Sequence, residues 1–168
     1  LPDLSRVKSL HTFATGAGWH GWMPKSEQIR VKFLWNVIGP IITRSSGYLA
    51  WKRFGLGENL PLGIYRQWKY WCSFPNYWFD DPTAGLQMQS SFARVQVPIT
   101  AFNAIDDKWA TPASRDAFMR HYVNADLRLV DLNPSELQLK TIGHMGYFRR
   151  GSEVLWDRVF DDIESLKD

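Results

Sequence analysis

Two acidic residues and one histidine occupy positions where catalytic side chains are common. Asp106 and Asp107 follow an apolar run and precede a stretch of helical character, and His144 lies in a glycine-flanked segment, residues 141–148. A histidine can act first as a base and then as an acid near neutral pH, provided that a carboxylate fixes its tautomer through Nδ1. Aspartates are also favoured in turns, so the acidic pair points to catalysis only when it is taken together with His144.

The elements around these residues predict that they meet at one edge of a sheet. Residues 95–104 are apolar and β-branched, residues 112–122 are typical of a helix, and residues 125–132 form a second β-like run. This order is the signature of parallel strands joined by a right-handed crossover, although Pro98 within the first run would remove a hydrogen-bond donor from the sheet. A loop over residues 133–148 and a terminal helix over about 151–166 complete this half.

The first half of the chain has a different character. Residues 7–15 predict a short buried strand, and the segment over about 16–90 is typical of short helices and loops. After Ser26, Ile29, Phe33 and Val37 form one apolar stripe with Leu34 and Ile38 beside it, which predicts a helix that stops at Gly39-Pro40. Two further helices are expected, over residues 47–54 and 61–71.

Residues 16–21, GAGWHG, match the G-x-G-x-x-G pattern of dinucleotide-binding loops. Such a loop should open directly into a helix whose amides face the pyrophosphate, whereas here an irregular segment with Pro24 follows. We therefore interpret the glycines as part of an exit loop. Neither an organic cofactor nor a metal ion is expected, and the single cysteine excludes a four-cysteine zinc site.

The second half of this chain contains, in order, a predicted strand, the segment Ala104-Ile-Asp-Asp-Lys-Trp-Ala-Thr-Pro, a predicted helix, the next strand and Gly143-His144-Met-Gly. This arrangement resembles the second half of an α/β-hydrolase. The sequence IGHMGYFR is similar to the corresponding segment of a poorly characterised group of serine hydrolases with this fold. The resemblance implies that Asp107, three residues after Ala104, is the orienting acid, with Asp106 in reserve, and that His144 is the general base. It also implies an α/β core over residues 1–15 and 91–168, with a helical cap inserted over 16–90.

The family's nucleophile elbow, G-x-S-x-G, does not occur in these residues. Family order places it before Leu1, together with the early strands of the sheet, and a first residue other than Met suggests a cut or processed chain. We therefore expect an esterase- or lipase-like serine hydrolase whose serine lies upstream. Cys72 is expected to be a small buried apolar residue, and the pairs Ser45-Ser46 and Ser90-Ser91 to be turn or cap residues.

The competing hypothesis is a non-catalytic fragment or truncated paralogue that acts as a binding or oligomerisation module. Its exposed sheet edges would need the upstream half of the fold or a second copy to cover them. A G-x-S-x-G sequence upstream of Leu1 would distinguish the two hypotheses.

Aromatic residues are concentrated in the predicted cap, which holds seven of the nine tryptophans. Alternating rings and cations could indicate a single-strand nucleic-acid platform, but residues 1–90 carry only ten basic against five acidic residues, so no nucleic-acid partner is expected. We expect a small acyl or ester substrate instead, bound against an aromatic pocket. The candidate substrate-binding residues are Trp19, Trp22, Trp68, Trp71 and Trp109.

Composition sets the remaining limits. A chain of 168 residues, 45% hydrophobic and 22% charged, is long enough for one domain with a buried core. The longest apolar run is broken by Gly39 and Pro40, so no membrane span is expected, and we expect a cytoplasmic protein. The sequence leaves open the identity of the substrate and the oligomeric state. It also does not distinguish hydrolysis from related acyl-transfer or dehalogenase chemistry.

Overall fold

The computed structural model describes residues 6–55 and 57–165 as an α/β fold built on a three-stranded parallel sheet. The strands are β1 (Leu10–Phe13), β4 (Ile99–Ala104) and β5 (Leu127–Leu132), in the order β1-β4-β5. Leu10 pairs with Ile99, and Ile99 with Leu127, so that all three strands end at the same edge. The predicted α/β class and the parallel pairing are confirmed.

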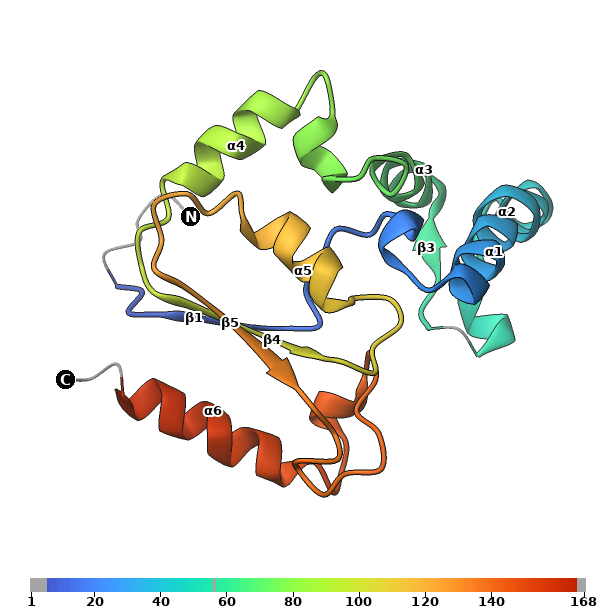
Figure 1. The fold of residues 1–168 in the computed structure, drawn as a ribbon. Helices are drawn as coiled ribbons and strands as arrows, with labels where there is room; N and C mark the ends of the chain where they lie inside the picture. The colour runs from blue at the N-terminus through green and yellow to red at the C-terminus, as the bar shows by residue number, and fades with distance from the viewer. Residues whose placement is uncertain (1–5, 56, 166–168) are drawn as a thin grey trace.

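Helices cover both faces of this sheet (Figure 1). Helices α4 (Gly85–Ala93) and α5 (Pro112–Met119) lie on one face, and α6 (Glu153–Ser165) lies on the other. The alternation along β4 explains the two layers, because Ile99 and Ala101 join the cluster with α5, while Phe102 and Ala104 join the cluster with α6.

The crossover from β4 to β5 begins with strong local signals. The side chain of Thr111 accepts a hydrogen bond from the Ser114 amide at 3.2 Å, and Pro112 occupies the first turn of α5. Pro98 lies immediately before β4, and its carbonyl accepts a hydrogen bond from the Leu10 amide at 2.9 Å. The proline therefore costs the sheet no donor within the strand.

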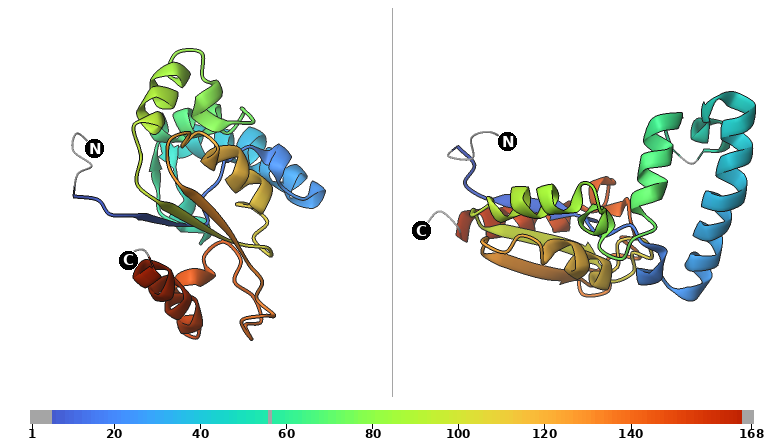
Figure 2. Two further views of the ribbon diagram at one scale, coloured as in Figure 1. Left: turned by 60° about the vertical axis from the view of Figure 1, so that its left-hand side comes forward. Right: turned by 90° about the horizontal axis from the view of Figure 1, so that it is seen from above.

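Residues 25–71 of the predicted cap lie beyond the carboxyl end of the sheet (Figure 2), whereas its last residues enter α4 over the face of the sheet. Helix α1 (Lys25–Phe33), a π-helical turn (Leu34–Ile38) and α2 (Gly39–Ser46) form one continuous helical stretch. The predicted stop at Gly39-Pro40 is wrong, because the Gly39 amide donates to the Leu34 carbonyl, five residues back. A widened turn of this kind lets a helix accommodate a proline, which has no amide hydrogen to donate.

The rest of the cap differs from prediction at two points. The helix expected over residues 47–54 is replaced by strand β2 (Tyr48–Leu49), which pairs with β3 (Leu60–Pro61), and by a 3-10 turn over Trp51–Phe54. Helix α3 (Leu62–Trp71) lies where a helix was expected over 61–71. Ser45-Ser46 and Ser90-Ser91 are helical residues of α2 and α4, not turn or cap residues.

No helix within the described ranges, 6–55 and 57–165, is both long and apolar enough to cross a membrane.

Candidate functional site

The structure brings Asp107 and His144 into direct contact at the carboxyl edge of the sheet. Nδ1 of His144 lies 2.9 Å from Oδ2 of Asp107, which leaves Nε2 as the ring nitrogen available to a reacting group. Asp107 is 1% exposed, whereas the His144 side chain is 38% exposed. A buried carboxylate against one ring nitrogen holds the imidazole in a single tautomer, and the accessible second nitrogen can then accept a proton.

The turn after β4 fixes the Asp107 carboxylate. Its second oxygen, Oδ1, accepts hydrogen bonds from the backbone amides of Trp109 at 2.8 Å and Ala110 at 3.0 Å. Asn103, fully buried at the end of β4, donates through its side-chain amide to the carbonyls of Thr15 and Ala110. The turn that carries the acid is therefore tied both to itself and to the loop that leaves β1.

Asp106 contacts the histidine loop rather than the imidazole. Its carboxylate accepts hydrogen bonds from the Thr141 hydroxyl at 2.7 Å and from the amides of Ile142 and Gly143, each at 3.0 Å. Partial burial opposes ionisation of Asp106, but these hydrogen bonds outweigh that effect and lower the pKa of its carboxyl. Gly143 adopts a φ of +57°, which a glycine tolerates, and this turns the chain toward His144.

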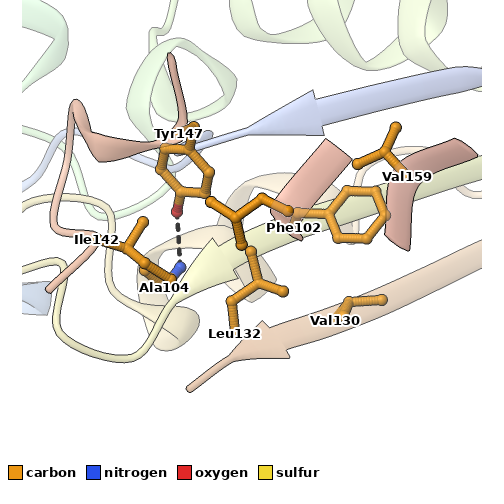
Figure 3. Packing of buried hydrophobic residues seen from close by; sticks show 8 residues of the cluster. Phe102, Ala104, Val130, Leu132, Ile142, Tyr147 and Val159 are labelled. Carbon is orange, nitrogen blue, oxygen red and sulfur yellow. Dashed lines mark hydrogen bonds between the residues drawn. The ribbon is translucent and has the colours of Figure 1, made fainter. Parts of the chain in front are cut away.

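Tyr147 holds the other side of the same loop. The Ala104 amide, at the end of β4, donates a hydrogen bond of 2.7 Å to the Tyr147 hydroxyl, inside the cluster drawn in Figure 3. Tyr147 is 1% exposed and packs with Ile142 and Leu132. Burial raises the pKa of this phenol, which keeps it neutral and suited to an apolar cluster.

A cavity of about 630 Å³ opens beside the histidine, and His144 is part of its lining. The cavity is lined by residues of the sheet edge, of the continuous helical stretch that begins with α1, of α3 and of α5, and most of these residues are apolar. The five tryptophans among the lining residues are Trp35, Trp51, Trp68, Trp78 and Trp109. Trp109 also lies against the imidazole, with ring centroids 5.5 Å apart, and its indole N–H donates to Glu27 at 3.4 Å.

The structure places the predicted substrate-binding tryptophans in two groups. Trp68 and Trp109 line the cavity, whereas Trp19, Trp22 and Trp71 are not among the described residues of its wall. The Trp71 indole donates to Asp81 at 2.9 Å, the Trp22 indole donates to the Pro75 carbonyl at 2.8 Å, and Trp19 packs edge-on against Trp22. These three side chains hold the cap loops together.

The residues of GAGWHG have packing roles. A β-carbon on Gly16 would lie 2.3 Å from the Ser114 hydroxyl oxygen and 3.2 Å from its backbone carbonyl carbon, so the exit loop of β1 can approach α5 only at a glycine. A 3-10 turn at His20–Trp22 follows the motif, and α1 begins only at Lys25, after Pro24. The loop therefore does not lead directly into a helix.

Three further residues position Asp107 and His144 and were not predicted from the sequence: Asn103, Thr141 and Tyr147. A signal existed for Asn103, since it is a polar residue at the end of an otherwise apolar strand. Among the described residues, no group of three or more His, Cys, Asp or Glu side chains is arranged to hold a metal ion.

No protein-family model matches this chain, and comparisons with curated proteins and with solved structures gave no match either.

Proposed function

We propose that this chain carries the acid and the base of an α/β-hydrolase-type serine hydrolase that cleaves an ester or a related acyl bond. The observation that carries the proposal is the 2.9 Å contact between Asp107 and Nδ1 of His144 at the rim of an aromatic cavity. The acid and the base follow adjacent parallel strands, where ligand sites of open α/β sheets form. We propose that the nucleophile is a serine supplied by a segment outside these 168 residues.

In the proposed reaction, Nε2 of His144 takes the proton of the serine hydroxyl as its oxygen attacks the acyl carbonyl carbon. Collapse of the tetrahedral intermediate breaks the bond to the leaving alcohol, which receives the proton from His144. Water then attacks the acyl-enzyme by the same route, releasing the acid and restoring the serine. The Asp107 carboxylate stabilises the imidazolium and keeps the ring oriented, since its two oxygens are held by His144 and by two amides.

Two nucleophiles of the cavity wall, Cys72 and Ser114, do not fit this role. Burial raises the pKa of the Cys72 thiol to about 12, so that the reactive thiolate is scarce at neutral pH. The Ser114 hydroxyl is fully buried and donates to the Ala17 carbonyl at 2.7 Å. A serine engaged in this way presents no hydroxyl proton to His144.

The lining of the cavity supports an apolar acyl or aromatic group as the bound part of the substrate. Trp68 and Trp109 supply large rigid surfaces, and Val31, Leu34 and Phe118 add aliphatic and aromatic walls. A cavity of this size and character can bury most of a small apolar ligand.

The proposal is tested by treating the intact protein from its natural source with a fluorophosphonate probe and mapping the modified peptide by mass spectrometry. We expect a labelled serine in a protein that also yields peptides of the printed sequence. The same protein with His144→Ala or Asp107→Asn should label at least 100-fold more slowly, because the serine then lacks its oriented base. His20→Ala, a histidine outside the described cavity wall, is the matched control and should label at the parent rate.

Two results would overturn the proposal: no labelled serine, or labelling of the His144→Ala variant at the parent rate. The first result would favour a binding module with an aromatic cavity, and the second would show that His144 is not the base that activates the serine.

A further inference from the structure

A row of large apolar side chains faces solvent along the cap helix. Ile29, Phe33, Val37 and Ile41 are 72%, 54%, 40% and 61% exposed. They lie four residues apart, so each sits one turn after the last on the continuous helical stretch over 25–46. The stripe noted in the sequence therefore forms the outer face of this helix rather than its packing face. We call these four side chains the outer stripe.

The opposite face of the same helix accounts for its packing. Val31 and Ile42 are buried, and Trp35 stacks on Tyr65 of α3 with ring centroids 5.6 Å apart. Val31 and Trp35 also line the cavity. Since the helix already has a packed inner face, its exposed outer stripe is not needed for the described fold.

The exposed charged residues on this helical stretch are all positively charged. Lys25, Lys32 and Arg44 are exposed, and Arg30 is exposed at the edge of the cavity that it helps to line, whereas the single acidic residue, Glu27, is buried. Glu27 lies 3.7 Å from Arg30 and accepts from the Trp109 indole, so its charge is directed inward. Solvent therefore meets an apolar row among cations.

We propose that the outer stripe is a docking surface for an anionic lipid membrane. A helix with apolar side chains on its outer face and lysine and arginine around them binds in the plane of a membrane interface, where rings and aliphatic chains enter the acyl boundary and cations meet lipid phosphates. The chemistry of the residues selects this occupant over a second copy of the chain. Pairing two such helices would bring Lys25, Lys32 and Arg44 of each copy together, and repulsion would oppose the contact.

The position of the stripe fits such a surface. The helix forms the outer margin of the cap, on the side away from the sheet (Figure 2). Its inner face lines the cavity that holds His144, so a membrane bound to the outer stripe would lie one helix away from an apolar ligand site. The docking proposal is independent of the proposed hydrolysis, because vesicle binding requires no chemistry.

The test is sedimentation of the chain with vesicles of phosphatidylcholine and phosphatidylglycerol in equal parts. We expect binding that falls as salt is raised, and little binding to phosphatidylcholine alone, because its zwitterionic headgroups carry no net negative charge to attract the cations. Phe33→Ser and Ile29→Ser should each weaken partition roughly tenfold, since each removes one inserted apolar side chain. Lys32→Glu should weaken binding to the anionic vesicles alone.

Phe160→Ser is the matched control, since Phe160 is an equally large side chain, 58% exposed on α6. It should bind vesicles as the parent does, and circular dichroism should show that every variant is folded. The proposal is overturned if the parent does not bind anionic vesicles, or if Phe33→Ser and Phe160→Ser bind equally well. It is also overturned if light scattering shows a dimer that Phe33→Ser dissociates, since the stripe would then be an interface between copies.

Discussion

Asp106 and Asp107 are adjacent in the chain, yet their carboxylates hold different parts of the same loop. Asp107 contacts the imidazole of His144. Asp106 accepts hydrogen bonds from two backbone amides and one hydroxyl of the three residues that precede His144 in the chain. One turn after β4 therefore fixes both the ring and the backbone that carries it. The acid assignment favours Asp107, because only its carboxylate contacts the ring.

Asp107→Asn should reverse the tautomer of His144. The asparagine carbonyl can keep the two amide contacts made by Oδ1, which leaves its NH2 group, a donor, against Nδ1. The ring would then carry its proton on Nε2 and could no longer act as a base. Two-dimensional nitrogen–proton spectra of the ring should show this change, and under the proposed function turnover by the intact protein should fall roughly 10⁴-fold.

Asp161→Asn, an exposed change on α6, serves as the control and should leave the His144 spectrum unchanged. A parent ring that already carries its proton on Nε2 would contradict the orienting role of Asp107.

Asp106→Asn should loosen the histidine loop while leaving the ring contact in place. We expect a loss of about 1 kcal/mol in the free energy of unfolding near neutral pH, because the carboxylate's charge-assisted contacts are weakened at a partly exposed site. Turnover should fall less than for Asp107→Asn. Urea unfolding of both variants beside the parent measures the difference, and a larger loss of turnover for Asp106→Asn would transfer the acid role to Asp106.

The stability difference between the parent and Asp106→Asn should depend on pH in one direction. The pKa of Asp106 is lower in the folded chain than its ordinary value, so its ionised form stabilises the fold above the ordinary pKa. This contribution is lost as the pH falls through the lowered pKa. The stability difference between parent and Asp106→Asn should therefore shrink on acidification, and a difference that grows would contradict the assignment.

Sequence was sufficient for the α/β class and for the edge where the site residues gather. Parallel strands end together, so the positions of Asp107 and His144 after adjacent strands already predicted their proximity. Their contact also depends on Asn103 and Tyr147, whose partners lie 88 and 43 residues away in the chain. No local pattern contains pairings of that range.

The cap was harder to predict, because packing there overrides local preference. A proline normally ends a helix, yet Pro40 continues one through a π-helical turn. Strands β2 and β3 have two residues each, too short for any alternation to appear. Which tryptophans line the cavity depends on loop contacts such as that between Trp71 and Asp81, which the sequence does not show.

Cys72 should resist alkylation while the chain is folded. Its side chain is buried, and burial raises the pKa of the thiol to about 12. Since the thiolate is the reactive form, iodoacetamide near pH 8 should modify the folded protein at least 10-fold more slowly than the urea-unfolded chain. Intact-mass spectrometry measures both rates, and equal rates would show that the thiol is accessible and ionised.

Asp162 should contribute strongly to stability, because it joins α6 to all three strands of the sheet. Its carboxylate accepts from His11 of β1 at 3.0 Å, from the Thr100 hydroxyl of β4 at 2.7 Å and from Arg128 of β5. These three residues occupy one row, since His11 pairs with Thr100 and Thr100 with Arg128. A single buried side chain therefore fixes the position of α6 across the sheet.

Asp162→Ala should lower the free energy of unfolding by about 2–3 kcal/mol, because the buried Thr100 hydroxyl and the partly buried His11 ring would be left without their acceptor. The exposed neighbour supplies the control, since Asp161→Ala should change stability by less than about 0.5 kcal/mol. Urea unfolding followed by circular dichroism compares the three proteins at one pH. Equal midpoints for parent and Asp162→Ala would mean that apolar packing by Leu155 and Val159 alone holds α6 on the sheet.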